Sequence, residues 1–315
     1  MAAPTKTKRK HEARRQREAL QRQQREKLQN MPDPFSRENI KKIAIRLGLA
    51  AVVVWGLAFA IGHWVALAGA GVLTVLTIGV VLWGLNLAKK SKAVANIVKG
   101  ADTPEGRKEA LERLESDFKE GDTAATVARA QLQMQEDPRA ALATLESIDL
   151  DKVMATVADE TRTQRAMIHL MLGETDKARA LVDQVDLSRH KEHKTRASLA
   201  AIVGEAWARS GQARKAAALI ENFDLADDDY ADLKPQLLRS LAFAYSWSNQ
   251  NKKMKKTLRQ LQGLNPQLLS GFITKKKNPS GVNPRGVHPL LEKEAMTMLM
   301  RSGAVPRKMQ VKRGR

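Results

Sequence analysis

The chain has 315 residues, enough for one or two domains with tails, and it contains no cysteine. A chain without cysteine has neither a disulfide framework nor a thiolate metal site. Aromatic residues make up only 4% of the chain, and the apolar residues are mostly Ala, Leu and Val. This composition favours an all-α fold over a β-sandwich.

The net charge of +20 is unevenly distributed along the chain. Residues 1–42 carry a net charge of +8, residues 43–100 of +5, residues 101–251 of −7 and residues 252–315 of +14. A mildly acidic centre between two basic ends suits a chain that lies against an anionic surface. We therefore expect anionic lipid headgroups among its partners.

The first 42 residues form a basic arm. Residues 6–29 are rich in Arg, Lys and Gln, and they lack the apolar stripe that would hold a helix against a core. The arm is consistent with a solvated tail that attracts anionic lipid. It is also consistent with an arm that contacts RNA or a ribosome, because the same charge attracts any phosphate polymer. No interleaved aromatic residues support base stacking, and the charge alone leaves both readings open.

Residues 43–88 predict a transmembrane helical hairpin. Residues 43–61 are apolar apart from Arg46, and residues 65–87 contain no charge. As helices they measure about 28 and 35 Å, which matches a hydrocarbon core of about 30 Å. Only Gly62, His63 and Trp64 separate them. A single bent helix that enters and leaves the same face is the alternative to two crossings.

Lysines flank the hairpin on both outer sides and set its expected orientation. Lys41 and Lys42 precede the first span, and Lys89, Lys90 and Lys92 follow the second. The positive-inside tendency then places both termini and the remaining chain on the cytoplasmic side of the cell (inner) membrane. No Asp, Glu or Lys lies within either span, so the hairpin reads as an anchor and not as a transporter.

Residues 101–272 show an internal period of about 38 residues. The segments 140–150, 177–187 and 216–225 align, and their last leucines lie 37 and 38 residues apart. A fourth copy begins at Met254. The pattern predicts a first helix ahead of each copy, at residues 123–135, 159–172, 196–209 and 235–248. Repeated helix pairs of this kind predict an α-solenoid of about four helix pairs.

The repeat resembles the tetratricopeptide (TPR) family. The clearest unit contains Val203, Gly204, Trp207, Gly211, Ala216 and Ile220 at the spacing of the family's small and large residues. A second unit contains Ala166, His169, Gly173, Ala178 and Val182. The longer period and the missing closing prolines make this a divergent TPR-like array. A non-repetitive helical bundle is the alternative.

The TPR resemblance implies a concave surface, made by the first helices, that binds protein partners. By that analogy the partner-binding groove presents Glu205, Arg209, Arg239, Phe243 and Trp247. The same analogy adds Met134, Met167 and Met171, on the first helices of the two earlier pairs, to the groove, but their flexible side chains fit ordinary packing between repeats better.

Residues 273–315 read as a basic linker, a short helix and a tail. Pro279, Pro284 and Pro289 punctuate the linker. A helix follows over residues 290–303, and one apolar face of it carries Leu291, Ala295, Met298 and Leu299. We expect this face to dock on the repeat array or on a partner.

The sequence contains no recognisable catalytic, cofactor-binding or metal-binding motif, and we predict that the chain is not an enzyme. His190 and His193 occupy a charged segment between repeats, which reads as solvated surface. The favoured function is a membrane-anchored cytoplasmic adaptor or scaffold for protein partners. The alternative is a membrane tether for RNA or ribosomes through the basic ends.

Overall fold

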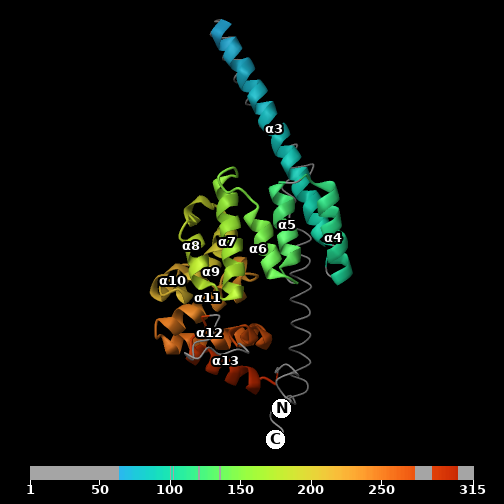
Figure 1. The fold of residues 1–315 in the computed structure, drawn as a ribbon. Helices are drawn as coiled ribbons and strands as arrows, with labels where there is room; N and C mark the ends of the chain where they lie inside the picture. The colour runs from blue at the N-terminus through green and yellow to red at the C-terminus, as the bar shows by residue number, and fades with distance from the viewer. Residues whose placement is uncertain are drawn as a thin grey trace, which may run out of the picture. The chain divides into compact units, whose positions relative to one another are not determined.

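The computed structural model describes residues 64–99, 101, 103–119, 121–134, 136–273 and 286–303. These residues form α-helices and short 3₁₀ helices and include no β-strand (Figure 1). The prediction of an all-α fold is therefore confirmed for them. The basic arm, the first predicted span, most of the linker (residues 274–285) and the tail (residues 304–315) lie outside the described residues.

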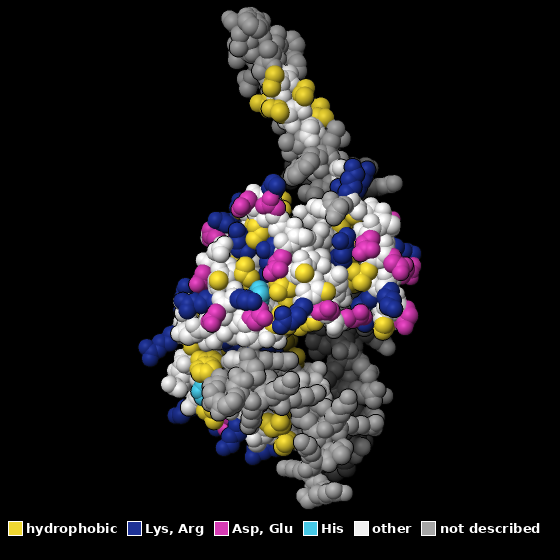
Figure 2. Space-filling view, in the orientation of Figure 1, with side chains coloured by type: hydrophobic (Ala, Val, Ile, Leu, Met, Phe, Trp, Pro, Cys, Tyr) yellow, Lys and Arg dark blue, Asp and Glu magenta, His cyan; other side chains and the backbone are white. Residues whose placement is uncertain are grey.

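The chain divides into two compact units, residues 1–92 and residues 93–315. Helix α3 (Trp64–Lys99) is 36 residues long and contributes to both. In the first unit its large apolar side chains are more than half exposed: Val72, Leu73, Val75, Leu76 and Ile78. They form a band of hydrophobic side chains on this helix in Figure 2. Among the described residues, no helix combines the length and the apolar character that crossing a membrane requires.

The second unit begins with a small core formed by the end of α3, α4 (Pro104–Asp117) and α5 (Thr123–Gln133). Helix α4 starts because Pro104 occupies its first turn and the Thr103 hydroxyl accepts the Gly106 N–H at 3.0 Å. Leu114 is completely buried in this core. The sequence pattern had not predicted α4.

Four helix pairs follow one another along the body, as predicted. Helix α5 pairs with α6 (Pro138–Glu146), and α7 (Ala155–Leu172) pairs with α8 (Thr175–Val182). Helix α9 (His193–Arg209) pairs with α10 (Ala213–Glu221), and α11 (Lys234–Trp247) with α12 (Asn251–Leu264). Figure 1 shows the pairs stacked in chain order. Two short 3₁₀ helices, η1 (Leu187–Arg189) and η2 (Asp228–Tyr230), lie in the connections.

The last three pairs repeat with a step of 38 residues in backbone geometry as well as in sequence. The residue in the turn of each pair has a positive φ: Gly173 at 84°, Gly211 at 94° and Asn249 at 59°. The N–H of the following residue closes the turn on the first helix in all three pairs, at 2.8, 2.8 and 2.9 Å. One turn geometry therefore sets the angle between the two helices of each pair.

Buried positions follow the same step. Small residues Ala166, Gly204 and Ala242 are buried on the first helices, and Val182, Ile220 and Leu258 are buried on the second. At Gly204 the approach is closest, because a Cβ atom there would lie 3.0 Å from the Ile220 side chain. Small and large buried residues thus recur with the 38-residue step in the last three pairs.

The C-terminal part folds back onto the last pairs. The 3₁₀ helix η3 (Pro266–Phe272) follows α12, and α13 (Pro289–Arg301) packs against η3, α12 and α11. Leu291, Ala295 and Leu299 of α13 are completely buried. The predicted apolar face of this helix thus docks on the repeat body of its own chain.

Candidate functional site

Four of the five predicted groove residues come together in one cluster between α9 and α11, and the fifth, Trp247, lies one turn further along α11. Glu205 and Arg209 lie one turn apart on α9, and Arg239, Phe243 and Trp247 lie one turn apart on α11. Helical spacing of four residues places each set on one face of its helix. Glu205, Arg209 and Phe243 are buried, whereas Arg239 and Trp247 are partly buried.

The Glu205 carboxylate is the centre of this cluster. Arg209 Nη1 donates to Glu205 Oε1 at 2.8 Å, and Arg239 donates to both carboxylate oxygens at 2.8 and 3.1 Å. Arg209 Nη2 also donates to the Leu170 carbonyl of α7 at 3.1 Å. The carboxylate therefore links α9 to α11, and Arg209 extends the link to α7.

The two guanidinium groups keep the buried carboxylate ionised. Burial alone would raise the pKa of Glu205, but the charges of Arg239 and Arg209 outweigh burial and lower the pKa to about 2. In return, the Glu205 charge raises the pKa of Arg239. At neutral pH the cluster thus holds one carboxylate and two guanidinium groups, with one positive charge in excess.

Aromatic rings cover the guanidinium groups. The Cζ atoms of Arg209 and Arg239 lie 5.1 and 5.4 Å from the centre of the Phe243 ring. Phe272 of η3 packs on Phe243 with ring centres 5.3 Å apart. Cation–π contacts in a desolvated site stabilise this arrangement more than they would at the surface.

A returning segment of the same chain covers this face. The Trp247 indole N–H donates to the Gly286 carbonyl at 3.1 Å, and the His288 ring meets the indole edge-on at 4.8 Å. Gly286 has a φ of 65°, and a Cβ atom there would lie 3.4 Å from Arg209 Nε. The positive φ favours glycine, because a residue with a side chain is strained in this conformation. The candidate groove is thus occupied from within the chain.

His288 connects the returning segment to α13. Its Nδ1 accepts the Leu290 N–H at 3.2 Å and so caps the helix. Burial lowers the pKa of His288, which favours the neutral ring that this cap requires. Sequence reasoning missed Phe272, Gly286 and His288, although a Gly-x-His-Pro pattern before a helix is a local signal for a capped start.

The three methionines of the predicted groove differ in placement. Met134 and Met167 are partly buried, and Met134 packs against a core that includes Leu142 and Ile168. Met171 is 45% exposed at the end of α7. Among the described residues, no polar or ring contact joins these methionines to the Glu205 cluster. Packing in its own core explains the position of Met134.

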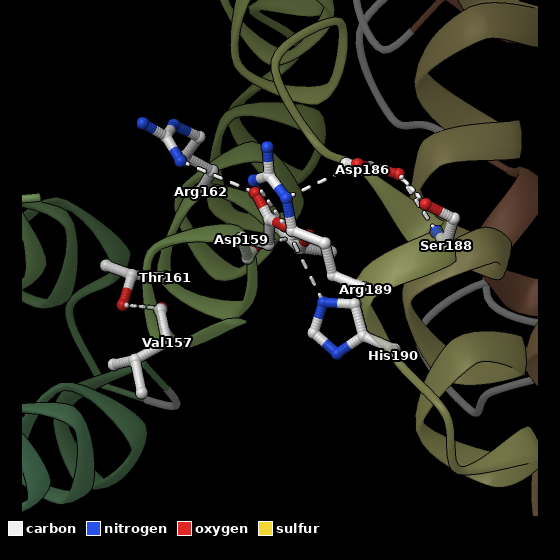
Figure 3. Close-up of polar contacts among 9 residues, drawn as sticks. Val157, Asp159, Thr161, Arg162, Asp186, Ser188, Arg189 and His190 are labelled. Carbon is white, nitrogen blue, oxygen red and sulfur yellow. Dashed lines mark hydrogen bonds and ion pairs between the residues drawn. The ribbon is translucent and has the colours of Figure 1, made fainter. Parts of the chain in front are cut away.

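A second buried polar cluster surrounds Asp159 on α7 (Figure 3). Arg162 Nη1 and Arg189 Nη1 lie 3.4 and 3.3 Å from the two oxygens of the fully buried Asp159 carboxylate. His190 Nε2 lies 3.7 Å from one of them. The prediction that His190 is solvated surface is therefore wrong: the side chain is buried because η1 turns it toward α7. His193 is exposed, as predicted.

No three His, Asp or Glu side chains among the described residues are grouped in a way that would hold a metal ion. The Asp159 cluster links η1 to α7, and the Glu205 cluster links α7, α9 and α11. Both clusters of charged side chains hold neighbouring helices in position. The basic segments predicted to attract lipid or RNA lie largely outside the described residues.

Comparison of the chain with protein-family models, with curated proteins and with solved structures finds no match.

Proposed function

We propose that this protein is a membrane-anchored adaptor whose helical body binds segments of partner proteins. The observation that carries the proposal is the face of α9 and α11 that already holds an extended piece of the same chain, residues 286–288. That face offers an indole N–H for a backbone carbonyl, at Trp247, and the helix that follows, α13, packs on η3, α12 and α11. Stacked helical repeats offer extended surfaces of this kind to partner segments.

We further propose that the body is a divergent TPR-like array. The 38-residue step of Gly173, Gly211 and Asn249 supports this assignment, as does the close crossing at Gly204. In such arrays the first helices form the binding surface, and here the Glu205 cluster and Trp247 lie on the first helices α9 and α11.

The membrane anchor is the second part of the proposal. Residues 65–87 contain no charged side chain, and the described part of α3 exposes Val72, Val75 and Leu76 by 62%, 69% and 63%. A helix that exposes apolar side chains on several sides needs a lipid or protein environment. We propose a hairpin of residues 43–88 in the cell membrane, with both flanking segments in the cytoplasm.

The adaptor function is tested by cross-linking the full chain in cells, followed by purification and mass spectrometry. Gly204→Trp overpacks the crossing of α9 and α10, whereas Ala218→Trp lies on the exposed side of α10 and is the matched control. We expect a set of proteins that the wild type and Ala218→Trp capture and Gly204→Trp loses. Capture of the same proteins by all three variants would contradict the proposal.

The orientation is tested by labelling single cysteines, since the chain has none of its own. Ser36→Cys precedes the hairpin, and His63→Cys lies between the two predicted spans. In intact cells a membrane-impermeant maleimide is expected to label His63→Cys and to label Ser36→Cys only after permeabilisation. Labelling of Ser36→Cys in intact cells would refute the proposed orientation.

A further inference from the structure

The interface between the last two helix pairs contains a hollow of about 280 Å³. It lies between α10, α11 and α12. Its apolar lining consists of Ile220, Phe223, Leu225 and Leu241, and its polar lining of Glu221, Tyr245, Lys253, Lys256, Thr257 and Gln260. This volume lies just below the range of about 300–1,000 Å³ that is usual for small-molecule sites. A hollow of this size has room for a single large side chain.

The 38-residue step shows what stands at the same positions one pair earlier. Leu219 precedes Thr257 by one step, and Trp207 precedes Tyr245. Leu219 and Trp207 pack against the apolar core of their interface. In the last interface the smaller Thr257 and Tyr245 stand at these positions, and both line the hollow.

The polar links across the two interfaces are equivalent. Trp207 Nε1 donates to Asp183 at 2.7 Å, and Tyr245 Oη donates to Glu221 at 2.8 Å. Lys253 also donates to Glu221, at 2.8 Å. Hydrogen bonds from Lys253 and Tyr245 lower the pKa of Glu221, so the carboxylate is ionised and its charge is already balanced.

One lining side chain of the hollow adds a positive charge. Lys256 stands where the preceding pair has Ala218, its side chain is exposed, and it forms no ion pair with any described residue. Among the side chains that line the hollow, Glu221 is balanced by Lys253, so Lys256 leaves a net charge of +1. Phe223 and Leu225 are only partly buried beside it. The opening therefore combines apolar walls with a cationic edge.

We propose that this hollow binds one bulky apolar side chain of a partner protein, flanked in the partner by acidic residues. An aromatic or branched side chain would fill the space that Leu219 fills one pair earlier, and neighbouring carboxylates would face Lys256. Anchors of this kind supply most of the affinity in protein interfaces, and a charge at the rim sets the association rate and its salt dependence. The inference rests on the proposed adaptor function and assigns to it a second surface, separate from the face of α9 and α11.

The test measures binding of fluorescein-labelled peptides to the purified full chain by anisotropy. The probe is Gly-Asp-Asp-Phe-Asp-Asp-Gly; one comparison peptide has Gly in place of Phe, and another has Asn in place of every Asp. We expect saturable binding of the probe and at least about tenfold weaker binding of both comparison peptides. Equal binding of the Gly peptide, or no binding of the probe, would overturn the inference.

Thr257→Leu is the decisive variant because it restores the residue of the preceding pair. The Thr257 hydroxyl donates only to the Lys253 carbonyl within α12, at 3.0 Å, so its removal leaves no new buried group without a partner inside the hollow. We expect an unchanged or higher melting temperature and about tenfold weaker probe binding. Unchanged binding by a folded Thr257→Leu chain would also overturn the inference.

Charge variants separate the rim from the general basicity of the chain. Lys256→Ala is expected to weaken probe binding about two- to fivefold and to reduce its salt dependence. Lys252→Ala removes the same charge from an exposed position of α12 outside the hollow and should change binding less. An equal effect of both variants would count against a local site.

The outcome for cellular partners distinguishes this inference from the adaptor proposal. If Thr257→Leu loses the probe but captures every protein that the wild type captures, the hollow is not the partner site and the adaptor proposal stands. If the wild type captures no protein that Gly204→Trp loses, the adaptor proposal fails, and peptide binding alone would not restore it.

Discussion

At the scale of single residues, the Glu205 carboxylate links two first helices of the body. It is buried, it holds two guanidinium groups, and it connects first helices of successive pairs. A buried carboxylate of this kind stabilises the fold only while both partners are present, because removal of the carboxylate leaves charged groups buried without compensation.

Glu205→Ala should therefore lower the free energy of unfolding by about 3 kcal/mol, near the lower end of the range for a broken buried ion pair because the Arg239 side chain is partly exposed. The measurement is urea unfolding of the full chain in detergent, followed by circular dichroism. Glu109→Ala, which removes an exposed carboxylate paired with Arg113, is the control and should cost at most about 0.5 kcal/mol. Equal losses would show that the Glu205 cluster adds no stability.

The low pKa of Glu205 also predicts a pH dependence. The folded-state pKa of about 2 lies below the usual value of 4.5, so the carboxylate stabilises the fold fully above pH 4.5. That stability is lost as the pH falls from 4.5 toward 2. The difference in melting temperature between the wild type and Glu205→Gln should shrink over this range. Parallel curves for the two proteins would contradict the assignment.

At the scale of helices, the crossing of α9 and α10 sets the repeat geometry. Gly204 faces the Ile220 side chain so closely that even a methyl group would require Ile220 to move. Gly204→Trp should lower the free energy of unfolding by about 3 kcal/mol or more through overpacking. Thermal unfolding measures the loss against Ala218→Trp on the exposed side of α10. Unchanged melting of Gly204→Trp would show that the register of α9 and α10 is wrong.

The attachment of α13 is the second prediction at this scale. Leu291 of α13 is completely buried, whereas Met300 on the same helix is 42% exposed. Leu291→Asp places a charge in an apolar contact and should release α13, because burying an unpaired carboxylate is costly. Limited proteolysis should then cut residues 286–303 faster than in the wild type or in Met300→Asp. Equal cutting rates would show that α13 is held by other contacts.

At the scale of the whole molecule, the sequence predicts the helix pairs, but it does not predict that residues 286–288 cover the face of α9 and α11. The positions of Gly173, Gly211 and Asn249 are visible in the sequence because a left-handed turn favours glycine or asparagine. Helix α4 was missed because it lies ahead of the repeat and has its own capping pattern, with Thr103 and Pro104. A repeat pattern predicts only the helices that recur with its period, and α4 is not one of them.

The candidate site shows the same limit. Helical spacing placed Glu205, Arg209 and Arg239 on the first helices, and the structure brings them together. Sequence spacing carries no information about Gly286, which reaches Trp247 after the linker over residues 274–285. The burial of His190 was missed for a related reason: Asp159, its partner, lies 31 positions earlier and outside any motif.

The 38-residue step also has a mechanical consequence. Each pair packs mainly on its neighbours in the chain, so tension along the body would detach pairs one at a time and not the whole unit at once. Each detached pair of 38 residues would extend to about 130 Å. Under load the body would therefore lengthen in steps of similar size. Each step would break the links of one first helix to its neighbour, among them the contact of Arg239 with Glu205.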